Sequence, residues 1–175
     1  MKRLVPDSVI LGLLKLQPAH GYELLTFFRS DSELGRIWTM STSQLYAVLK
    51  RLEEEGSIIG EQVEVSDAPP RVIYSLTKSG EEQFMSWLYE NKPSVSIHKI
   101  RVMFLSRLYI ALLLHLPFEE IIEYQMSVLE NQHTILLTEK QKSLSTIENL
   151  AVEFMLSQIE SALSWLQDCH VELER

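Results

Sequence analysis

The feature that most constrains this chain is a short helical pattern followed directly by two β patterns. Ser41-Thr42-Ser43-Gln44 is a capping-box sequence, in which the Ser41 hydroxyl accepts from the Gln44 amide while the Gln44 side chain reaches back. Apolar residues then follow at helical spacing until Gly56, namely Leu45, Val48, Leu49 and Leu52. Residues 58–65 and 71–76 are rich in Val, Ile and Tyr, and they predict two strands. The proline-rich segment 66–70 between them is expected to be an unpaired loop.

Helical patterns lie on both sides of this segment. Asp7 and Ser8 are placed to cap a first helix, His20-Gly21 opens a second, and Thr77 starts a fourth that ends before Pro93. The expected order is three short helices, a two-stranded hairpin and another helix, which is the order of a winged helix-turn-helix. In that fold, the helix after Ser41 has the position of the recognition helix. We therefore predict a mainly α fold with a small β-hairpin wing, and a DNA-binding domain over residues 1–92.

The sequence after Pro93 differs from the part before it because it contains no strand pattern. Three amphipathic helices are expected there: Ile97 to Leu116, a second helix restarted by Pro117, and a third from Ile147 to Cys169. The apolar stripes of these helices are broad, and the domain to which they are attached already has its own core. The stripes therefore favour packing against the surface of a partner chain. We predict a C-terminal helical dimerisation domain over residues 93–175, and the alternative is a helical bundle within one chain.

The charge is distributed unevenly along the sequence. The 175 residues contain 16 Lys and Arg against 24 Asp and Glu, a formal net charge of −8. Three segments without acidic residues, 1–6, 35–52 and 68–80, together carry +7, and the remaining chain carries −15. These segments are the N-terminal arm, the recognition helix and the far side of the wing, which a winged helix presents to DNA. The overall acidity argues against indiscriminate coating of nucleic acid, while the local positive charge permits a selective contact.

Catalytic and metal-binding patterns are missing from the sequence. The five histidines are scattered, and the single Cys169 excludes an internal disulfide framework and a Cys-rich zinc site. The sequence has neither a Gly-rich phosphate loop nor a Gly-x-Ser-x-Gly turn. We therefore predict a protein that is not an enzyme and uses no cofactor or metal. The most apolar later run, Leu108 to Leu114, is far shorter than the roughly 20 residues of a spanning helix. A soluble, cytoplasmic protein without a membrane partner is expected.

Several of these segments also match a known family in order and spacing. The matching segments are Ile10-Leu11-Gly12-Leu13-Leu14, His20-Gly21-Tyr22-Glu23-Leu24, Trp38, Ser43-Gln44-Leu45-Tyr46, residues 49–56, Pro70-Arg71, Tyr74-Ser75-Leu76-Thr77 and Gly80. The sequence resembles the PadR family of bacterial transcriptional regulators, in the branch whose long helical C-terminal region is shared with AphA-type virulence activators. The match is strong over residues 4–90 and looser in the C-terminal helices, around Arg107 and Glu160 to Leu166.

This resemblance implies a homodimeric repressor that binds a palindromic double-stranded operator. In that family the recognition helix enters the major groove, the wing lies along the minor groove or backbone, and some members release DNA on binding phenolic acids or other planar aromatics. One departure is that Asp67 and Ala68 stand where many relatives have glycine or basic residues, so wing contacts would rest on Arg71. The sequence leaves open whether the output is repression or activation. An adaptor that uses the winged helix to bind protein instead of DNA is the alternative.

Seven residues are the candidate DNA contacts: Tyr22, Thr42, Ser43, Gln44, Tyr46, Lys50 and Arg71. Short polar side chains in the first turn of a recognition helix can reach base edges or phosphates, and Lys50 and Arg71 supply charge. Each has a structural alternative. The first-turn residues could serve only as caps, the tyrosines could be packing residues, and Lys50 could be solvated. Arg71 could bind the carbonyl groups of its own loop, and Arg51 is set aside because residues 53–55 offer it an ion pair.

An effector pocket is a further possibility in the C-terminal part. Eight aromatic and methionine residues could line it: Met103, Phe104, Tyr109, Tyr124, Met126, Phe154, Met155 and Trp165. Stripes at helical spacing equally form a plain core or a dimer interface, so no ligand residues are assigned.

Overall fold

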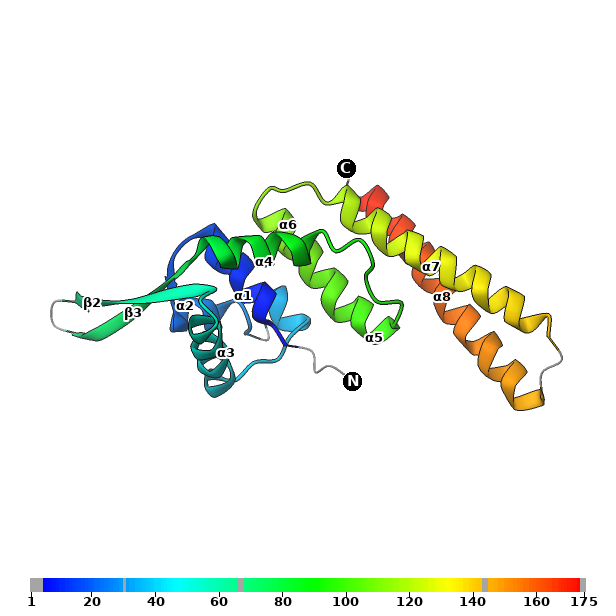
Figure 1. Cartoon of the computed structure of the whole chain (residues 1–175), viewed down its shortest axis with the longest axis horizontal. Coiled ribbons are helices and arrows are strands. Elements are labelled where there is room, and N and C mark those ends of the chain that lie inside the picture. Colours follow the sequence, from blue (N-terminus) through cyan, green and yellow to red (C-terminus); the bar gives the residue numbers. More distant parts are fainter. Residues whose placement is uncertain (1–4, 30, 66–67, 143–144, 174–175) are drawn as a thin grey trace. The chain divides into compact units, whose positions relative to one another are not determined.

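The computed structural model describes residues 5–29, 31–65, 68–142 and 145–173, except for the side chains of residues 65–70. The chain forms two compact units (Figure 1). The first unit comprises Met1–Tyr89 and Leu105–Pro117, and the second comprises Glu90–Phe104 and Phe118–Arg175. The grouping therefore differs from the expected boundary between residues 92 and 93, because 105–117 packs with the N-terminal unit. The division into a DNA-binding domain (1–92) and a dimerisation domain (93–175) stays a prediction.

The first unit is built around a buried helix, α1 (Asp7–Leu16), in which every residue from Val9 to Leu14 is buried. Its neighbours include α4 (Lys78–Leu88) and α6 (Leu105–Leu113). Gly12 permits this close packing, since a β-carbon there would lie 2.6 Å from the Ile110 side chain. The first helix begins differently from the expectation: Pro6 is its N-cap, and no side chain caps it.

The remaining helices of the first unit form the helix-turn-helix. They are α2 (Gly21–Thr26), a single 3-10 turn η1 (Leu34–Arg36) and α3 (Thr42–Glu54). The helix expected after Thr77 is confirmed as α4, with the Thr77 hydroxyl accepting from the Gly80 amide at 3.1 Å. Trp38, between η1 and α3, donates through Nε1 to the Ser106 hydroxyl at 2.7 Å and so ties this connection to α6.

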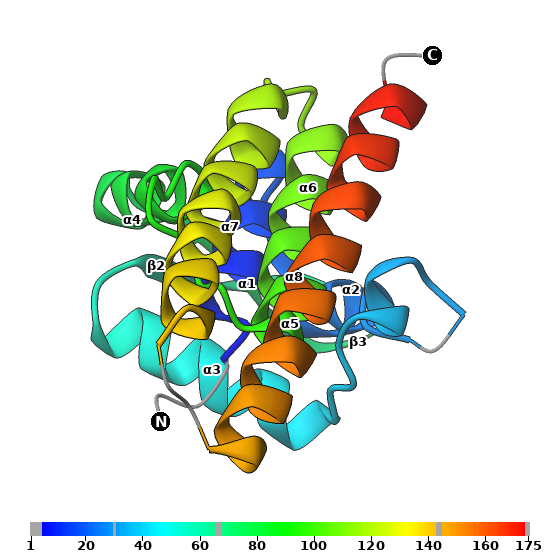
Figure 2. The same ribbon diagram turned by 90° about the vertical axis from the view of Figure 1, so that its right-hand side faces the viewer.

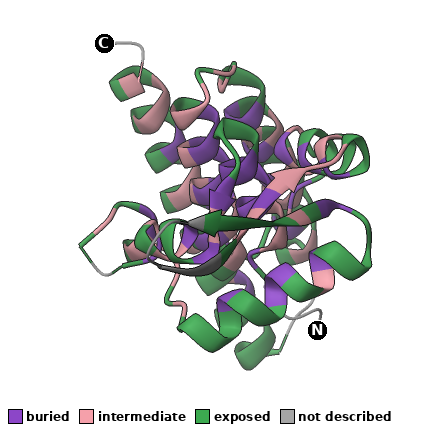
Figure 3. Ribbon diagram, turned by 90° about the vertical axis from the view of Figure 1, so that its left-hand side faces the viewer, coloured by how far each residue is buried: buried purple, intermediate pink, exposed green. Residues whose placement is uncertain are grey.

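A three-stranded antiparallel sheet completes the first unit, in the order β1–β3–β2. Strand β2 (Ile58–Val65) has the predicted bounds, and β3 is Ala68–Leu76. The two strands form a ribbon that extends away from the helices (Figure 1). In Figure 3, β2 is largely exposed and β3 is largely intermediate in burial. The mainly α fold with a hairpin wing is confirmed. The two-residue strand β1 (Ala19–His20) was not predicted.

The proline-rich segment between the strands differs from the expectation of an unpaired loop. Strand β3 already begins at Ala68, which pairs with Val65, and the register shifts by one residue before Arg71 pairs with Val63. Pro69 and Pro70 therefore share the position opposite Glu64. Proline lacks a backbone donor, and such a bulge is one of the few places where a sheet accepts it. Asp67, named above as a departure from the family pattern, lies outside the described residues together with Ser66, as does the side chain of Ala68.

The second unit consists mainly of two long helices, α7 (Glu119–Lys140) and α8 (Thr146–Leu173). They run side by side in opposite directions (Figure 2). Lys140 pairs with Glu153 at 3.0 Å, and His133 Nε2 lies 3.1 Å from Glu160, so polar contacts also join the two helices. The faces that meet are apolar, and the buried residues include Ile121, Ile122, Leu129, Leu136, Val152, Leu156, Ile159 and Leu166. The expected C-terminal helices are thus present.

The helix expected over residues 97–116 is interrupted. It consists of α5 (Ile97–Lys99), a π-helical turn η2 (Ile100–Phe104) and α6, which ends at Leu113. Pro117 precedes α7 instead of occupying its first turn, because Phe118 is the N-cap. The Pro117 carbonyl group accepts a hydrogen bond from the Tyr89 hydroxyl at 2.9 Å. Throughout the described residues, no helix has both the length and the apolar character needed to cross a membrane.

Candidate nucleic-acid interface

The start of α3 has the capping box that the sequence predicts. The Ser41 hydroxyl accepts from the Gln44 amide at 3.3 Å, and Gln44 Oε1 accepts from the Ser41 amide at 2.8 Å. Ser41 Oγ also lies 3.1 Å from Ser43 Oγ. Residues 41–44 are all exposed. The capping role of Ser41 is therefore confirmed, and Gln44 shares in it through its carbonyl oxygen, while Thr42 and Ser43 present short polar side chains at an exposed helix start.

The rest of α3 is divided between a buried and an exposed side. Leu45, Val48, Leu49 and Leu52 are buried, as the spacing predicts. Ser43, Tyr46 and Lys50 are exposed, and their spacing of three and four residues places them along one face. Lys50 lies 3.8 Å from Glu54, but its side chain is 77% exposed, so this contact contributes little. The helix thus presents a polar stripe that ends in a positive charge.

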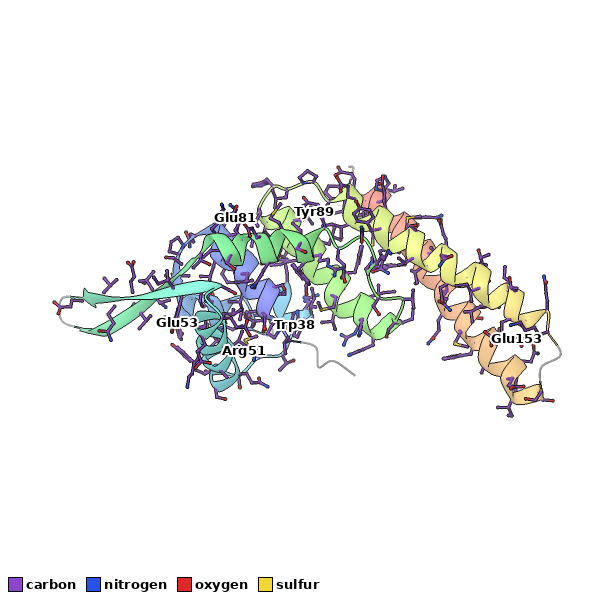
Figure 4. The ribbon with its side chains drawn as sticks, in the orientation of Figure 1. Trp38, Arg51, Glu53, Glu81, Tyr89 and Glu153 are labelled. Carbon is purple, nitrogen blue, oxygen red and sulfur yellow. The ribbon has the colours of Figure 1, made fainter. Side chains whose placement is uncertain are left out.

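Arg51 belongs to a different contact from the one the sequence suggests. Arg51, which Figure 4 labels on α3, pairs with Asp7 and not with the acidic run 53–55: Nε donates to Oδ2 at 3.2 Å, and Nη2 donates to Oδ1. The side chains are 40% and 23% exposed, respectively. Asp7 is therefore the partner of α3 and not a helix cap. Glu53 instead accepts the Gly60 backbone amide at 3.0 Å and joins α3 to the wing.

Three of the predicted contact residues come together in a groove of about 410 Å³. Its lining residues are His20, Gly21, Tyr22, Tyr46, Arg71, Val72 and Tyr74. The pairing of β1 with β3, Ala19 to Tyr74 and His20 to Ile73, brings the start of α2 to the wing. Burial raises the pKa of Tyr74, as do the nearby Glu53 and Tyr46, so this phenol is neutral at pH 7. The groove thus combines the neutral phenol of Tyr74 with the cationic side chain of Arg71.

Tyr22 and Tyr46 are exposed in this groove, by 59% and 47%. Tyr22 is therefore not packed beneath α3. Its hydroxyl accepts from Arg29 Nη2 at 2.6 Å, and the Arg29 guanidinium lies 5.3 Å from its ring centre. Arg29 was missed by the sequence analysis, because its link to Tyr22 spans seven residues and a helix end. It adds a second cation beside the groove.

His20 was also missed as a candidate. Its Nε2 lies 3.4 Å from Arg71 Nη1, and its Nδ1 accepts from the Glu23 amide at 3.2 Å. The sequence shows His20-Gly21 only as a helix start, and the strand pairing that brings His20 to the wing is two residues long. Lys2 and Arg3 of the expected N-terminal arm lie outside the described residues.

The second unit has a groove of its own, of about 420 Å³. It is lined by residues 95–98 and by α7 and α8 residues that include Gln132, Met155 and Gln158. Of the residues proposed for an effector pocket, Met155 lines this groove, whereas Phe104 and Trp165 pack edge to face with ring centres 5.7 Å apart. Phe154 is 64% exposed.

Metal binding has no structural counterpart where the chain is described. Among those residues, no group of three or more His, Cys, Asp or Glu side chains could hold a metal ion. Cys169 is partly buried, and its burial together with the charge of Asp168 raises the pKa of its thiol.

Comparison with known proteins agrees with the geometry of the first unit. Residues 10–86 match the transcriptional regulator PadR-like family. The negative transcriptional regulator PadR of Bacillus subtilis is 34% identical over 84 residues, which are 48% of this chain and 45% of that protein. The matched segment thus spans about half the length of this curated relative.

Two crystal structures of Bacillus subtilis PadR are similar over more of the chain. The complex with operator DNA is 24% identical and covers 95% of this chain and 97% of that chain, with a TM-score of 0.47. The complex with p-coumaric acid is 23% identical and covers 97% and 96%, with a TM-score of 0.44. The family that the first unit matches consists of transcriptional regulators and not of enzymes. The first unit is thus similar, over residues 10–86, to the PadR-like family of transcriptional regulators.

Proposed function

We propose that this protein is a homodimeric transcriptional regulator that binds double-stranded operator DNA. The observation that carries the proposal is the exposed stripe Ser43–Tyr46–Lys50 on α3, which leads into the groove that also holds Tyr22 and Arg71. Polar groups at a helix start, hydroxyl groups and two cations are the chemistry that binds phosphates and base edges. Bacillus subtilis PadR, the relative of this segment, is known in complex with operator DNA. Acting on DNA, the protein would work in the cytoplasm.

Each candidate residue has a separate role in this proposal. Thr42, Ser43 and Gln44 approach base edges or phosphates at the start of α3, and Lys50 neutralises a phosphate further along the helix. The hydroxyl groups of Tyr46 and Tyr22 donate hydrogen bonds to the DNA backbone, and Arg71 supplies the contact between the wing and DNA. Arg51 takes no part, because Asp7 already neutralises it.

The homodimer is proposed from exposed apolar residues on α8. Ile147, Leu150 and Phe154 are 75%, 55% and 64% exposed, and their spacing places them on one face. They lie on a different side from the residues that pack against α7, such as Val152 and Leu156. Large exposed side chains gathered in this way mark association surfaces in soluble proteins. A second copy of the chain would cover this face and place two first units on one operator.

Repression relieved by a small aromatic effector completes the proposal. The Bacillus subtilis relative is named a negative regulator, and a structure of it contains p-coumaric acid. The groove at residues 95–98 in the second unit, with Met155 and Gln158, offers apolar and amide groups for a planar acid. Phenolic acids are therefore the first effector class to test.

A mobility shift with the DNA upstream of the gene tests the binding role. Lys50→Ala should weaken binding to all duplexes and lower the salt slope by about 0.9. Gln44→Ala should alter base preference, with Ser41→Ala as the control that removes only the capping hydroxyl. Lys92→Ala, at an exposed lysine of the second unit, is the control for charge. If both test variants bind like the wild type, α3 is not the recognition helix. If the wild type binds no duplex, the adaptor alternative is favoured.

A further inference from the structure

Two hydrogen-bond donors face each other at the edge of the groove in the first unit. His20 Nδ1 accepts the Glu23 backbone N–H at 3.2 Å, so the proton of the neutral imidazole lies on Nε2. That Nε2 atom is 3.4 Å from Arg71 Nη1, which is also a donor. Two N–H groups cannot bond to each other. Their proximity is favourable only when an acceptor, and best an anion, binds both.

The imidazole is held in this orientation from two sides. Glu23 Oε2 accepts the His20 backbone N–H at 3.0 Å, and the Glu23 backbone N–H donates to His20 Nδ1. These two hydrogen bonds form a reciprocal capping box. Glu23 Oε1 lies 3.6 Å from Nε2, which is beyond hydrogen-bond distance. The His20 side chain is only 17% exposed. The Nε2–H group is therefore pre-oriented, and its direction does not depend on DNA.

Other polar groups around this pair also suit an anion. The Tyr22 hydroxyl accepts from Arg29, which leaves its own proton for another acceptor. The Tyr46 hydroxyl lies next to the α-carbon of Gly21, in the same groove. The nearby carboxylate of Glu23 has one oxygen bound to the His20 amide. The groove thus presents donors from three elements, namely the α2 start, α3 and β3.

We propose that His20 and Arg71 together hold one phosphodiester group of the DNA backbone, which rests on the proposed DNA-binding function. His20 Nε2–H donates to one non-bridging oxygen and the Arg71 guanidinium donates to the other. His20 contributes a neutral, pre-oriented hydrogen bond, whereas Arg71 contributes the charge. His20 is thereby a DNA-contact residue, and the β1–β3 pairing is what assembles the contact from the start of α2 and the wing.

The substitution that isolates this role is His20→Asn. Asparagine is a good N-cap residue, and its amide oxygen can replace Nδ1 as the acceptor for the Glu23 N–H. It has no donor at the position of Nε2. His115→Asn is the matched control, because His115 is exposed in the first unit at φ 52°, where asparagine is tolerated. Thermal unfolding of the full-length variants checks that the His20→Asn cap and fold are intact.

Binding of an operator duplex is measured by fluorescence anisotropy over a range of salt concentrations. His20→Asn should weaken binding about tenfold without changing the salt slope, as expected for a neutral donor to a charged acceptor. Arg71→Ala should weaken binding and lower the salt slope by about 0.9. The double variant should lose less than the product of the two single losses, because both residues act on one phosphate. His115→Asn should bind like the wild type.

A phosphate scan identifies the group that is bound. Replacing one phosphate per half-site by an uncharged methylphosphonate should, at a single position, weaken wild-type binding by a larger factor than it weakens His20→Asn, in which Arg71 alone still contacts that phosphate. If the wild type binds the duplex and a folded His20→Asn binds equally tightly, the inference is overturned and the DNA-binding role stands. If His20→Asn reduces only the binding of inorganic phosphate, the site holds free phosphate and the DNA assignment is overturned. If the wild type binds no duplex, the proposed function itself fails.

Discussion

The ring of Tyr46 lies directly against the α-carbon of Gly21. A β-carbon at residue 21 would be 2.8 Å from both Cζ and the hydroxyl oxygen of Tyr46. The contact joins the exposed stripe of α3 to the start of α2 and fixes the position of the Tyr46 hydroxyl in the groove. Glycine is needed at residue 21 because of this close approach and not because of its backbone conformation.

Gly21→Ala should therefore displace Tyr46 at a small cost in stability. The obstructing atoms are the far end of a half-exposed side chain, so we expect a loss of about 1 kcal/mol or less in the free energy of unfolding. Operator affinity should fall severalfold, because the Tyr46 hydroxyl leaves its place. Urea denaturation and anisotropy titration measure the two effects. An affinity equal to that of the wild type would show that Tyr46 does not contact DNA.

Gly80→Ala is the contrasting case in the same unit. A β-carbon there would lie 2.0 Å from the Ser57 carbonyl oxygen, which is backbone and cannot swing aside. The start of α4 and the Thr77 cap would have to shift. We predict a loss of about 3 kcal/mol in the free energy of unfolding, as for severe overpacking. If denaturation showed Gly80→Ala to be as stable as Gly21→Ala, the start of α4 would not pack as closely against the Ser57 backbone as the structure shows.

Asp7 and Lys50 should separate stability from DNA binding. Asp7→Asn leaves Arg51 without its ion pair, and because both side chains are partly exposed we expect a loss of only about 1 kcal/mol in stability. DNA affinity should not decrease, since a negative charge near α3 is removed. Lys50→Ala should do the reverse, with unchanged stability and weaker binding. Parallel unfolding and binding curves test the pair, and a similar pattern for both variants would contradict the separate roles.

The exposed face of α8 predicts the oligomeric state. Phe154→Glu places a charge in the proposed interface and should convert the dimer to a monomer at micromolar concentration. Gln167→Glu adds the same charge at an exposed polar position of the same helix and should leave the dimer intact. Sedimentation equilibrium measures both. A wild-type monomer, or a Phe154→Glu dimer as tight as the wild type, would rule out this interface.

The start of α8 should respond to acid. Hydrogen bonds from Ser145, backbone first, lower the pKa of Glu148. A lowered pKa means that the folded state favours the carboxylate. The contribution to stability is therefore present above the pKa of the unfolded state and is lost as the pH falls through the lower folded value. The protection of the Ser145 amide, measured as its exchange rate relative to an unstructured peptide at the same pH, should fall in that acidic range, and Glu148→Gln should remove this pH dependence. An unchanged pH dependence in Glu148→Gln would identify another group as its cause.

Local patterns predicted the elements that depend on neighbouring residues. The Ser41–Gln44 capping box, the bounds of β2 and the buried face of α3 follow from spacing within a single turn or strand. Longer-range features were missed. Arg51 pairs with Asp7, which is 44 residues away in the sequence, and no local sequence pattern predicts that pairing. The prolines at 69–70 suggested a loop because the bulge that accommodates them depends on the partner strand.

The division of the predicted helix 97–116 has the same origin. The apolar stripe is continuous in sequence, but the π-helical turn at Ile100–Phe104 interrupts it, and α6 packs in the first unit. Ile110 on α6 meets Gly12 of α1. A chain truncated after Lys92, at the domain boundary that the sequence predicts, would therefore lack part of that unit's core. Substitutions in the full chain are the better test of each role.

A footprint on the DNA upstream of the gene tests whether this protein binds an operator as a dimer. Full-length protein at low salt should protect two half-sites related by dyad symmetry, with centres about 10 bp apart or a multiple of that distance. The protection should weaken steeply as salt is raised, because the contacts proposed for Lys50 and Arg71 are with phosphates. Protection without dyad symmetry would contradict the dimeric arrangement. A folded protein that protects no DNA at any concentration would contradict the proposed binding of operator DNA.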